Sequence, residues 1–336
     1  MQTFIEQLIN GITVGSFYAL VALGYTMVYG VLTMINFAHG EIFMLGAYFG
    51  FFTITRLVNI GLYQSNPTAA IFITFLCGGL FSALAGITVE KIAYRPLRKA
   101  TRLATLISAI GASIVLQELV RLLPTIGTII TSVKVGTNFI FPQSWQLSIM
   151  SVLRDLGGPA VKAYPGVLGT DGIRIAQIFI SYSRMLIVII SLSIMLILNV
   201  LVRFTKIGKA MRAVSEDKDT AALMGINVNQ IISYTFLIGS ALAGIAGVMV
   251  GMFYLQIRPT MGFVPGIKAF TSAVLGGIGN IPGAMVGGYI LGLAEVIGIQ
   301  FLPAVYKDFV AFMILILTLI FKPTGILGGT GGQNKL

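Results

Sequence analysis

Charged side chains are scarce in this chain, and cysteine, tryptophan and histidine occur only once each. Asp, Glu, Lys and Arg make up 10% of the 336 residues, whereas a soluble domain averages about 25%. Hydrophobic residues make up 56%, which leaves too little polar surface for a water-soluble protein. A lipid bilayer suits this composition, so we predict an all-α membrane protein. The single Cys77 cannot form an internal disulfide.

Signatures of enzymes and of nucleotide binding are also missing. Gly208-Lys209 is followed by Ala210, so the sequence holds no Gly-x-x-x-x-Gly-Lys-Ser/Thr loop. No Ser/His/Asp constellation or metal-ligand spacing is recognisable. The basic residues lie in loops without interleaved aromatics. We therefore expect no enzymatic activity, no cofactor or metal in this chain, and no nucleic-acid partner.

Long apolar runs, several of them broken by glycine, predict a polytopic bundle of about eight to ten transmembrane helices in one unit, residues 1–336. A span needs about 20 residues, and we count nine runs. They are Ile9–Tyr29, Gly40–Leu57, Ala69–Val89, Leu103–Leu122, Met185–Val202, Ile231–Leu255, Phe263–Gly279, Gly283–Leu302 and Ala304–Phe321.

Two clusters of basic residues indicate the orientation, because short loops rich in Lys and Arg stay in the cytoplasm. The first holds Lys91, Arg95, Arg98, Lys99 and Arg102, and the second holds Arg203, Lys206, Lys209, Arg212 and Lys218. Two spans separate them, which predicts an external N-terminus, a cytoplasmic C-terminus and an external segment over residues 124–184. That segment is either a docking surface for an external partner or an insertion without a specific role.

Small residues recur every four positions in three of the runs: Gly11, Gly15 and Ala19; Gly239, Ala243, Gly247 and Gly251; and Ala284, Gly288 and Gly292. This spacing is typical of close helix packing, and the lining of a conduit is the second interpretation. Asn36–Gly40–Gly46–Tyr48 also resembles Asn280–Gly283–Gly287–Tyr289. This is a weak internal repeat of the kind found in transporters.

Asn36, His39, Gly40 and Glu41 interrupt apolar sequence with three polar side chains and a glycine. An ionisable group at membrane depth costs about 2.5–3.5 kcal/mol on insertion scales, and it is tolerated where it faces a cavity or a partner. We interpret the segment as a discontinuous helix, broken at Gly40, beside the translocation path or its gate. With the repeat, Tyr48 and Asn280 join these candidates. The alternative for His39 and Glu41 is a satisfied hydrogen bond between helices or a turn at the membrane interface.

Other ionisable residues near the apolar runs have simpler interpretations. Glu118 and Arg121 stand three residues apart near the outer end of their predicted helix, which favours a local ion pair. Lys268 and Glu295 lie in different runs and could pair across helices.

The predicted cytoplasmic loop, residues 203–230, contains a short helix with strong end signals. Ser215 is a suitable N-cap, Glu216, Asp217 and Asp219 favour the first turn, and Gly225 suits the position after the last turn. A capped helix at this place suits insertion into a groove of a partner.

The segment Asp219-Thr220-Ala221 is followed by three residues, beginning with Ala222, and then by Gly225. This pattern resembles the Glu-Ala-Ala-xxx-Gly signature of permease subunits of ABC importers. The chain departs from it at two of the first three positions. Residues 15–41 and 273–284 further resemble the permeases of branched-chain amino acid importers. The resemblance implies that the helix from Glu216 to Gly225 couples to an ATPase.

The resemblance also implies a complex in the cytoplasmic (inner) membrane with a second homologous permease, two ATPase subunits that bind ATP, and an external substrate-binding protein. The implied substrates are branched-chain amino acids, and relatives of this family that carry urea or short amides provide the alternative. An alternative of another class is an ion-coupled transporter or channel, for which Glu41 and Glu295 would be the natural ion sites.

Overall fold

The structure is a computed structural model that describes residues 2–98, 100–132, 134–135, 138–139, 142–167, 171–175 and 178–328. Helices dominate these residues, and the strands form only isolated antiparallel pairs, which confirms the all-α fold class. The helices are α1 (Gln2–Leu32), α2 (His39–Asn59), α3 (Leu62–Ser65), α4 (Pro67–Val89), α5 (Arg102–Ser132), α6 (Gln143–Leu156), α7 (Tyr182–Phe204), α8 (Lys206–Glu216), α9 (Lys218–Leu223), α10 (Val228–Tyr254), α11 (Phe263–Gly276), α12 (Ile281–Phe301) and α13 (Lys307–Phe321). The strand pairs are β1–β2 (Lys134–Val135, Asn138–Phe139), β3–β6 (Lys162–Ala163, Gln256–Ile257) and β4–β5 (Gly172–Ile175, Ile178–Ser181).

Seven helices among the described residues are long and apolar enough to cross a membrane, two fewer than the nine runs suggest. The seventh and ninth runs form α11 and α13, of 14 and 15 residues. At 1.5 Å per residue these helices are about 21 Å long, short of a hydrocarbon core of about 30 Å. The difference arises because α11 begins only at Phe263, after the loop that follows β6, and α13 begins only after the turn that follows Pro303.

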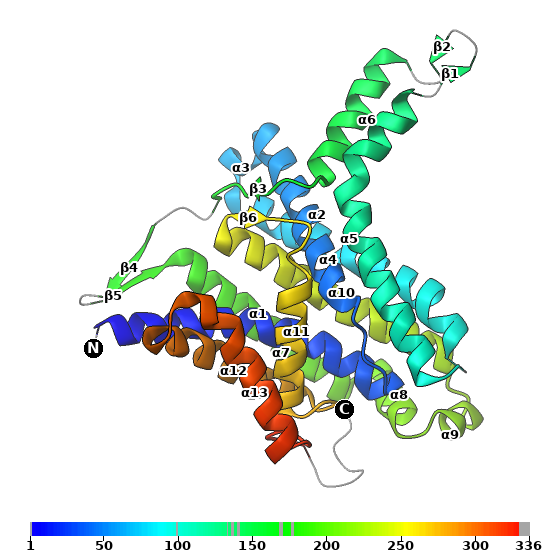
Figure 1. Cartoon of the computed structure of the whole chain (residues 1–336), viewed down its shortest axis with the longest axis vertical. Helices are drawn as coiled ribbons and strands as arrows, with labels where there is room; N and C mark the ends of the chain where they lie inside the picture. Colours follow the sequence, from blue (N-terminus) through cyan, green and yellow to red (C-terminus); the bar gives the residue numbers. More distant parts are fainter. Residues whose placement is uncertain are drawn as a thin grey trace.

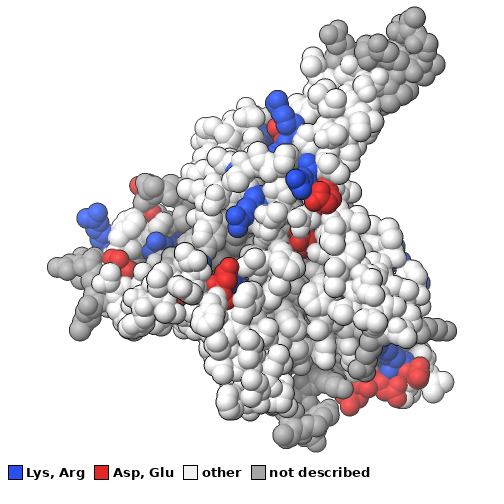
Figure 2. Space-filling model, viewed as in Figure 1, with Lys and Arg blue, Asp and Glu red and all other residues white. Residues whose placement is uncertain are grey.

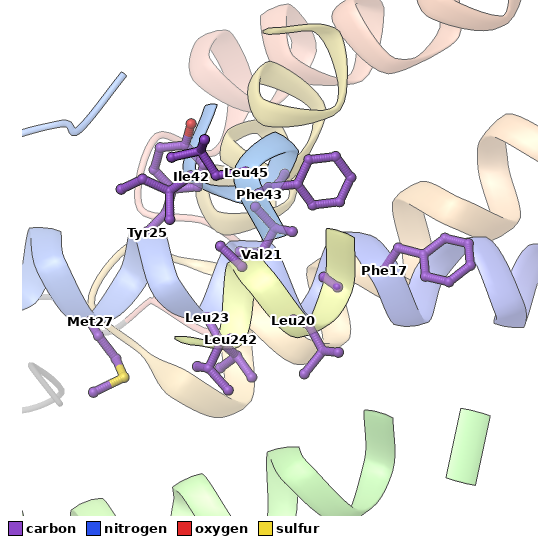
Figure 3. Packing of buried hydrophobic residues seen from close by; sticks show 14 of the residues in the cluster. Phe17, Leu20, Val21, Leu23, Tyr25, Met27, Ile42, Phe43, Leu45 and Leu242 are labelled. Carbon is purple, nitrogen blue, oxygen red and sulfur yellow. The ribbon is translucent and has the colours of Figure 1, made fainter. Parts of the chain in front are cut away.

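The core surrounds α1, which is almost entirely buried, whereas α5 and α7 leave many of their apolar residues exposed. Helix α12 lies along α1, and α10 packs against α1, α2 and α4 (Figure 1). In Figure 3 the side chains of Val21 and Tyr25 face residues of α2, while Leu20 and Leu23 lie on the side of Leu242 from α10. The exposed apolar faces suit contact with lipid or with another membrane subunit.

The ladders of small residues lie where helices cross, as the packing interpretation predicts. A β-carbon at Gly288 of α12 would overlap the backbone of Ala19 in α1, and one at Gly292 would overlap Gly15. Helices α2 and α10 meet in the same way at Gly46 and Gly244. Since the residue numbers rise in α12 as they fall in α1, these two helices are antiparallel.

Helix α5 continues beyond its predicted end at Leu122 and includes Pro124 within its length. Proline has no N–H to donate to the carbonyl four residues earlier. The Gly158 N–H takes that place and donates to Val120 O at 2.9 Å. Helices α5 and α6 then project from the bundle (Figure 1), and the β3–β6 pair joins the segment that follows α6 to the loop after α10. Glu118 and Arg121 form the expected ion pair at 3.3 Å.

The two basic clusters lie at one end of the bundle, apart from Lys99, which falls outside the described residues. Arg98 pairs with Glu90 and donates to the Asn229 side chain, 2.5 Å away. Lys218 of the second cluster donates to the Leu32 carbonyl at 3.5 Å, at the end of α1. Over most of the face in Figure 2 charged side chains are sparse, and acidic residues gather at the lower right, where Figure 1 places α9.

The close contact of α1 with α12 predicts a strong effect of one methyl group. Gly288→Ala should destabilise the protein by about 1–3 kcal/mol, because backbones must move apart to admit the β-carbon. Gly111→Ala in α5 is the matched control, since nothing lies within 4 Å of its added β-carbon. That substitution should leave stability unchanged or raise it by up to about 1 kcal/mol. Unfolding of the purified protein by SDS titration measures both, and equal midpoints for the two variants would contradict the packing account.

Candidate functional site

The polar segment re-enters the bundle after the end of α1. Thr33 has a positive φ of 57°, which is uncommon for a β-branched residue, and the chain then turns back without regular structure to Ala38. His39 opens α2 so deep in the bundle that a β-carbon at Gly24 of α1 would overlap its ring. A discontinuous helix is therefore present, but its break lies at residues 33–38. Gly40 is the second residue of α2 and not the break itself.

The beginnings of α2 and α11 meet at this depth. Gly262 directly precedes α11 and touches the backbone of Gly40, and Gly266 also lies against Gly40. A β-carbon at Gly262 would stand 2.5 Å from Oε2 of Glu41. The Glu41 carboxylate thus lies at the start of two helices, where the partial positive charge of the backbone N–H groups favours an anion. Glycine at these positions is what lets the two helix ends approach.

The polar side chains at this junction are buried and only partly bonded. Asn36 accepts a hydrogen bond from the Tyr94 hydroxyl at 2.7 Å, and the His39 ring packs edge-on against Tyr25. In the described part of the chain, no hydrogen bond of ordinary geometry reaches the ring nitrogens of His39 or the carboxylate oxygens of Glu41, although the Val21 backbone of α1 faces the His39 ring and Ser113 of α5 faces Glu41. Both interpretations of these two side chains, a place on a path and a hydrogen bond between helices, therefore stay predictions.

Tyr48 and Asn280 do not join this junction. Tyr48 is fully buried about 13 Å further along α2, where the Lys162 ammonium lies 5.9 Å from the centre of its ring. Asn280 caps α12 by accepting from Gly283 N and donates to Leu327 O at 2.7 Å. Each of the two repeat segments leads into a helix, but the structure places Tyr48 and Asn280 at different sites.

A cavity of about 310 Å³ lies beside the junction, between α1, α10, α11 and α13. Val21, Phe43 and Met261 line it and come from the same stretches of α1, α2 and the loop before α11 that form the junction. A separate small cleft is lined by Tyr25, Tyr29, Ile35, Phe270, Ala273 and Ile278. Helices α1 and α11 thus contribute residues to both the cavity and the cleft.

A buried ion network stands at the wall of the cavity. Lys268 Nζ lies 2.8 Å from Glu295 Oε1, which confirms the pair that sequence left open, and 2.6 Å from Asp308 Oδ1. Lys307 reaches the same Glu295 oxygen at 3.1 Å, and the Tyr18 hydroxyl donates to the other at 2.8 Å. Sequence reasoning missed Lys307 and Asp308 because they lie inside the last apolar run, yet two adjacent charges in such a run were a usable signal.

The cytoplasmic loop forms two helices, α8 and α9, and not one. Ser215 lies within α8 and donates to Arg212 O, so it is not the N-cap, and Glu216 ends that helix. Asp217 caps α9 instead, accepting from the N–H groups of Asp219 and Thr220 at 2.9 and 3.2 Å. Together with the Thr220 hydroxyl, these donors hold the pKa of Asp217 below its ordinary value. The correction follows from geometry, since an aspartate reaches both N–H groups of its own first turn.

The exposed surface of α9 is apolar at its end. Leu223 and Met224 expose 88% and 79% of their area, beside the exposed Ala222. Ala221, which belongs to the signature pattern, is buried against the rest of the chain, so it offers no exposed surface to a partner. Gly225 has a φ of +82° and open space around it, in agreement with its predicted place after the last turn. Two such exposed apolar side chains suit a contact with a partner, and we name them the α9 tip (Leu223 and Met224).

Comparisons with known proteins give the family. Residues 7–319 match the family described as the permease component of branched-chain amino acid transport systems. The high-affinity branched-chain amino acid transport permease BraD of Pseudomonas aeruginosa is 45% identical over 97% of this chain and 96% of its own length. The corresponding LivH of Escherichia coli is 42% identical over the same shares.

A second kind of permease from such systems is also similar. LivM of Escherichia coli is 25% identical over 96% of this chain and 71% of its own length. The resemblance noted in the sequence is thus confirmed over nearly the whole chain, and with it the assignment to a transport subunit and not to an enzyme. The chain belongs to the family of branched-chain amino acid transport system permease components.

Proposed function

We propose that this chain is the transmembrane permease subunit of an ATP-driven ABC importer that moves branched-chain amino acids across the cytoplasmic membrane. Family membership supports the assignment, and the α9 tip is the observation that carries it. Its Leu223 and Met224 are among the most exposed large apolar side chains of the described residues. An ion-driven carrier has no use for such a contact, whereas a permease without a phosphate-binding loop needs a partner that hydrolyses ATP.

The complex would contain a second homologous permease, two ATPase subunits and an external binding protein. The similarity to LivM supports the second permease, and the exposed apolar faces of α5 and α7 offer surfaces that it could cover. ATP would bind only to the ATPase subunits, at the cytoplasmic side where α9 lies.

The substrate route would run from the cavity through the junction at His39 and Glu41 to the cleft beside Tyr29. Glycines form the walls of the junction at Gly24, Gly40 and Gly262, so small shifts of α2 or α11 would open or close it. Glu295 suits an ion-coupled carrier poorly, because Lys268, Lys307 and Tyr18 already occupy its oxygens.

The first test concerns docking at the α9 tip. Leu223→Glu should weaken binding of the ATPase by about thirtyfold, because damage to an interface anchor often costs more than about 2 kcal/mol. ATP-driven uptake of leucine by vesicles that contain the complete importer should fall with it. Leu147→Glu in α6, also an exposed leucine, is the control and should leave the ATPase bound. Full retention of the ATPase by Leu223→Glu would refute the coupling role, and uptake of urea in place of leucine would refute the substrate.

Orientation has a separate test with matched cysteines in a Cys77→Ser background. Leu223→Cys should react with a membrane-impermeant maleimide only from the cytoplasmic side, and Leu147→Cys only from outside. The reason is the retention of Lys- and Arg-rich loops in the cytoplasm. Labelling of both positions from the same side would contradict the proposed orientation.

The junction predicts a role for the Glu41 charge. Glu41→Gln keeps the size of the side chain but removes the anion that stands at the start of α2 and α11. Uptake per inserted molecule should fall by about tenfold or more, while the ATPase stays bound. Glu118→Gln, at a half-exposed pair on α5, should transport normally. Wild-type uptake by Glu41→Gln would leave the junction a packing feature only.

A further inference from the structure

The cavity beside the junction combines a charged wall with an apolar one. Lys268, Lys307 and Asp308 line the first. Within this wall the two lysines are matched by Asp308 and by Glu295 behind it, so the network is neutral as a whole. Asp308 bonds to Lys268 through Oδ1 and its side chain is 52% exposed, which leaves the second carboxylate oxygen for another donor.

Arg258 is the charge that this network does not balance. It lines the cavity next to Gln256 and Thr260, and its exposed guanidinium has no ion pair or hydrogen bond within the part of the chain that the structure describes. A guanidinium presents donors in a fork that matches a carboxylate. The lining of the cavity therefore carries one free cation, Arg258, and, beside Lys268, one half-free carboxylate, Asp308.

The rest of the lining includes aliphatic and aromatic side chains, which form the apolar wall. Phe17 and Val21 of α1, Phe43 of α2, and Met261 and Val264 at the start of α11 contribute it. A volume of about 310 Å³ falls within the range of small-ligand pockets. Burial of an aliphatic side chain against such a wall is favourable at about 25 cal/mol per Å².

We infer that this cavity is a binding site, on the permease itself, for the zwitterion of an aliphatic amino acid. Arg258 receives the carboxylate, Asp308 receives the ammonium group, and the wall of Phe17, Val21, Phe43, Met261 and Val264 receives the side chain. The inference rests on the proposed function and extends it, because it makes the permease itself select the cargo. Urea carries neither a carboxylate to pair with Arg258 nor an aliphatic side chain for the apolar wall, so the same chemistry separates amino acids from urea.

The test is protection of cysteines by ligand in the purified importer complex, in nanodiscs and in a Cys77→Ser background. Val264→Cys and Thr260→Cys line the cavity, and Val305→Cys, a fully exposed position between α12 and α13, is the control outside it. Millimolar L-leucine should slow maleimide labelling at residues 260 and 264 and leave residue 305 unchanged. L-leucinamide, which lacks the carboxylate, should need about tenfold more for the same protection.

Arg258→Gln, combined with Val264→Cys, identifies the partner of the carboxylate. It should raise the half-protecting concentration of leucine about tenfold and leave that of leucinamide unchanged. The reason is that loss of the guanidinium from the protein and loss of the carboxylate from the ligand remove the same interaction. Arg174→Gln is the control for a general change of charge on an exposed arginine and should change neither concentration.

The outcomes separate the site from the proposed function. Leucine uptake by the complex without protection at residues 260 and 264, or equal protection by leucine and leucinamide, would overturn the site and leave the importer assignment intact. Protection by urea and not by leucine would overturn both.

Discussion

The absence of side chains at helix crossings is the constraint on which this structure depends. Lipid offers no hydrophobic force that drives one apolar helix onto another, so stability must come from close contact of backbones. Gly15 against Gly292 and Gly46 against Gly244 provide it. The same lack of a β-carbon at Gly24 leaves the space that the His39 ring occupies. Close packing and the re-entrant start of α2 are thus one feature, since a larger residue at position 24 would exclude both.

Backbone groups impose the second constraint, because water is not available in the hydrocarbon core to satisfy them. The chain breaks its helices only where replacement partners exist. Pro124 frees the Val120 carbonyl and Gly158 bonds to it. At the re-entrant turn the His39 N–H donates to Asn36 O, and Ala38 O accepts from Ile42. These bonds let α2 begin inside the bundle, and they place polar side chains at a depth where a continuous helix would have none.

Sequence could predict the features that depend on residues close together in the chain. It failed for features that depend on contacts between distant parts of the chain. Gly225 and the Glu118–Arg121 pair were predictable because local geometry determines both. The N-cap of α9 was predicted at Ser215 and is Asp217. Both residue types are good N-caps, and only the end of α8 at Glu216 distinguishes them. The cavity could not be predicted, since its charges come from α11, α13 and the loop before α11, and proximity across helices leaves no signature in spacing. The internal repeat led us to group Tyr48 and Asn280 with His39. A repeat reports that two segments have a similar order of residues, and it does not report that those residues lie close together.

A chain of direct contacts joins the proposed docking surface to the proposed gate. Lys218 begins α9 and reaches the carbonyl of Leu32, the last residue of α1, so a force on the α9 tip acts at the point where α1 ends. The next residues are the irregular turn to Ala38, and then His39 and Glu41 at the crossing of α2 with α11. Gly15 and Ala19 hold α1 in place against α12. The irregular turn is therefore the part of this path that can change its conformation. Movement of α9 by an ATPase would therefore be transmitted to the start of α2, where two helix ends are separated only by glycines, and a shift of rigid helices by an ångström or two is enough to change such a crossing.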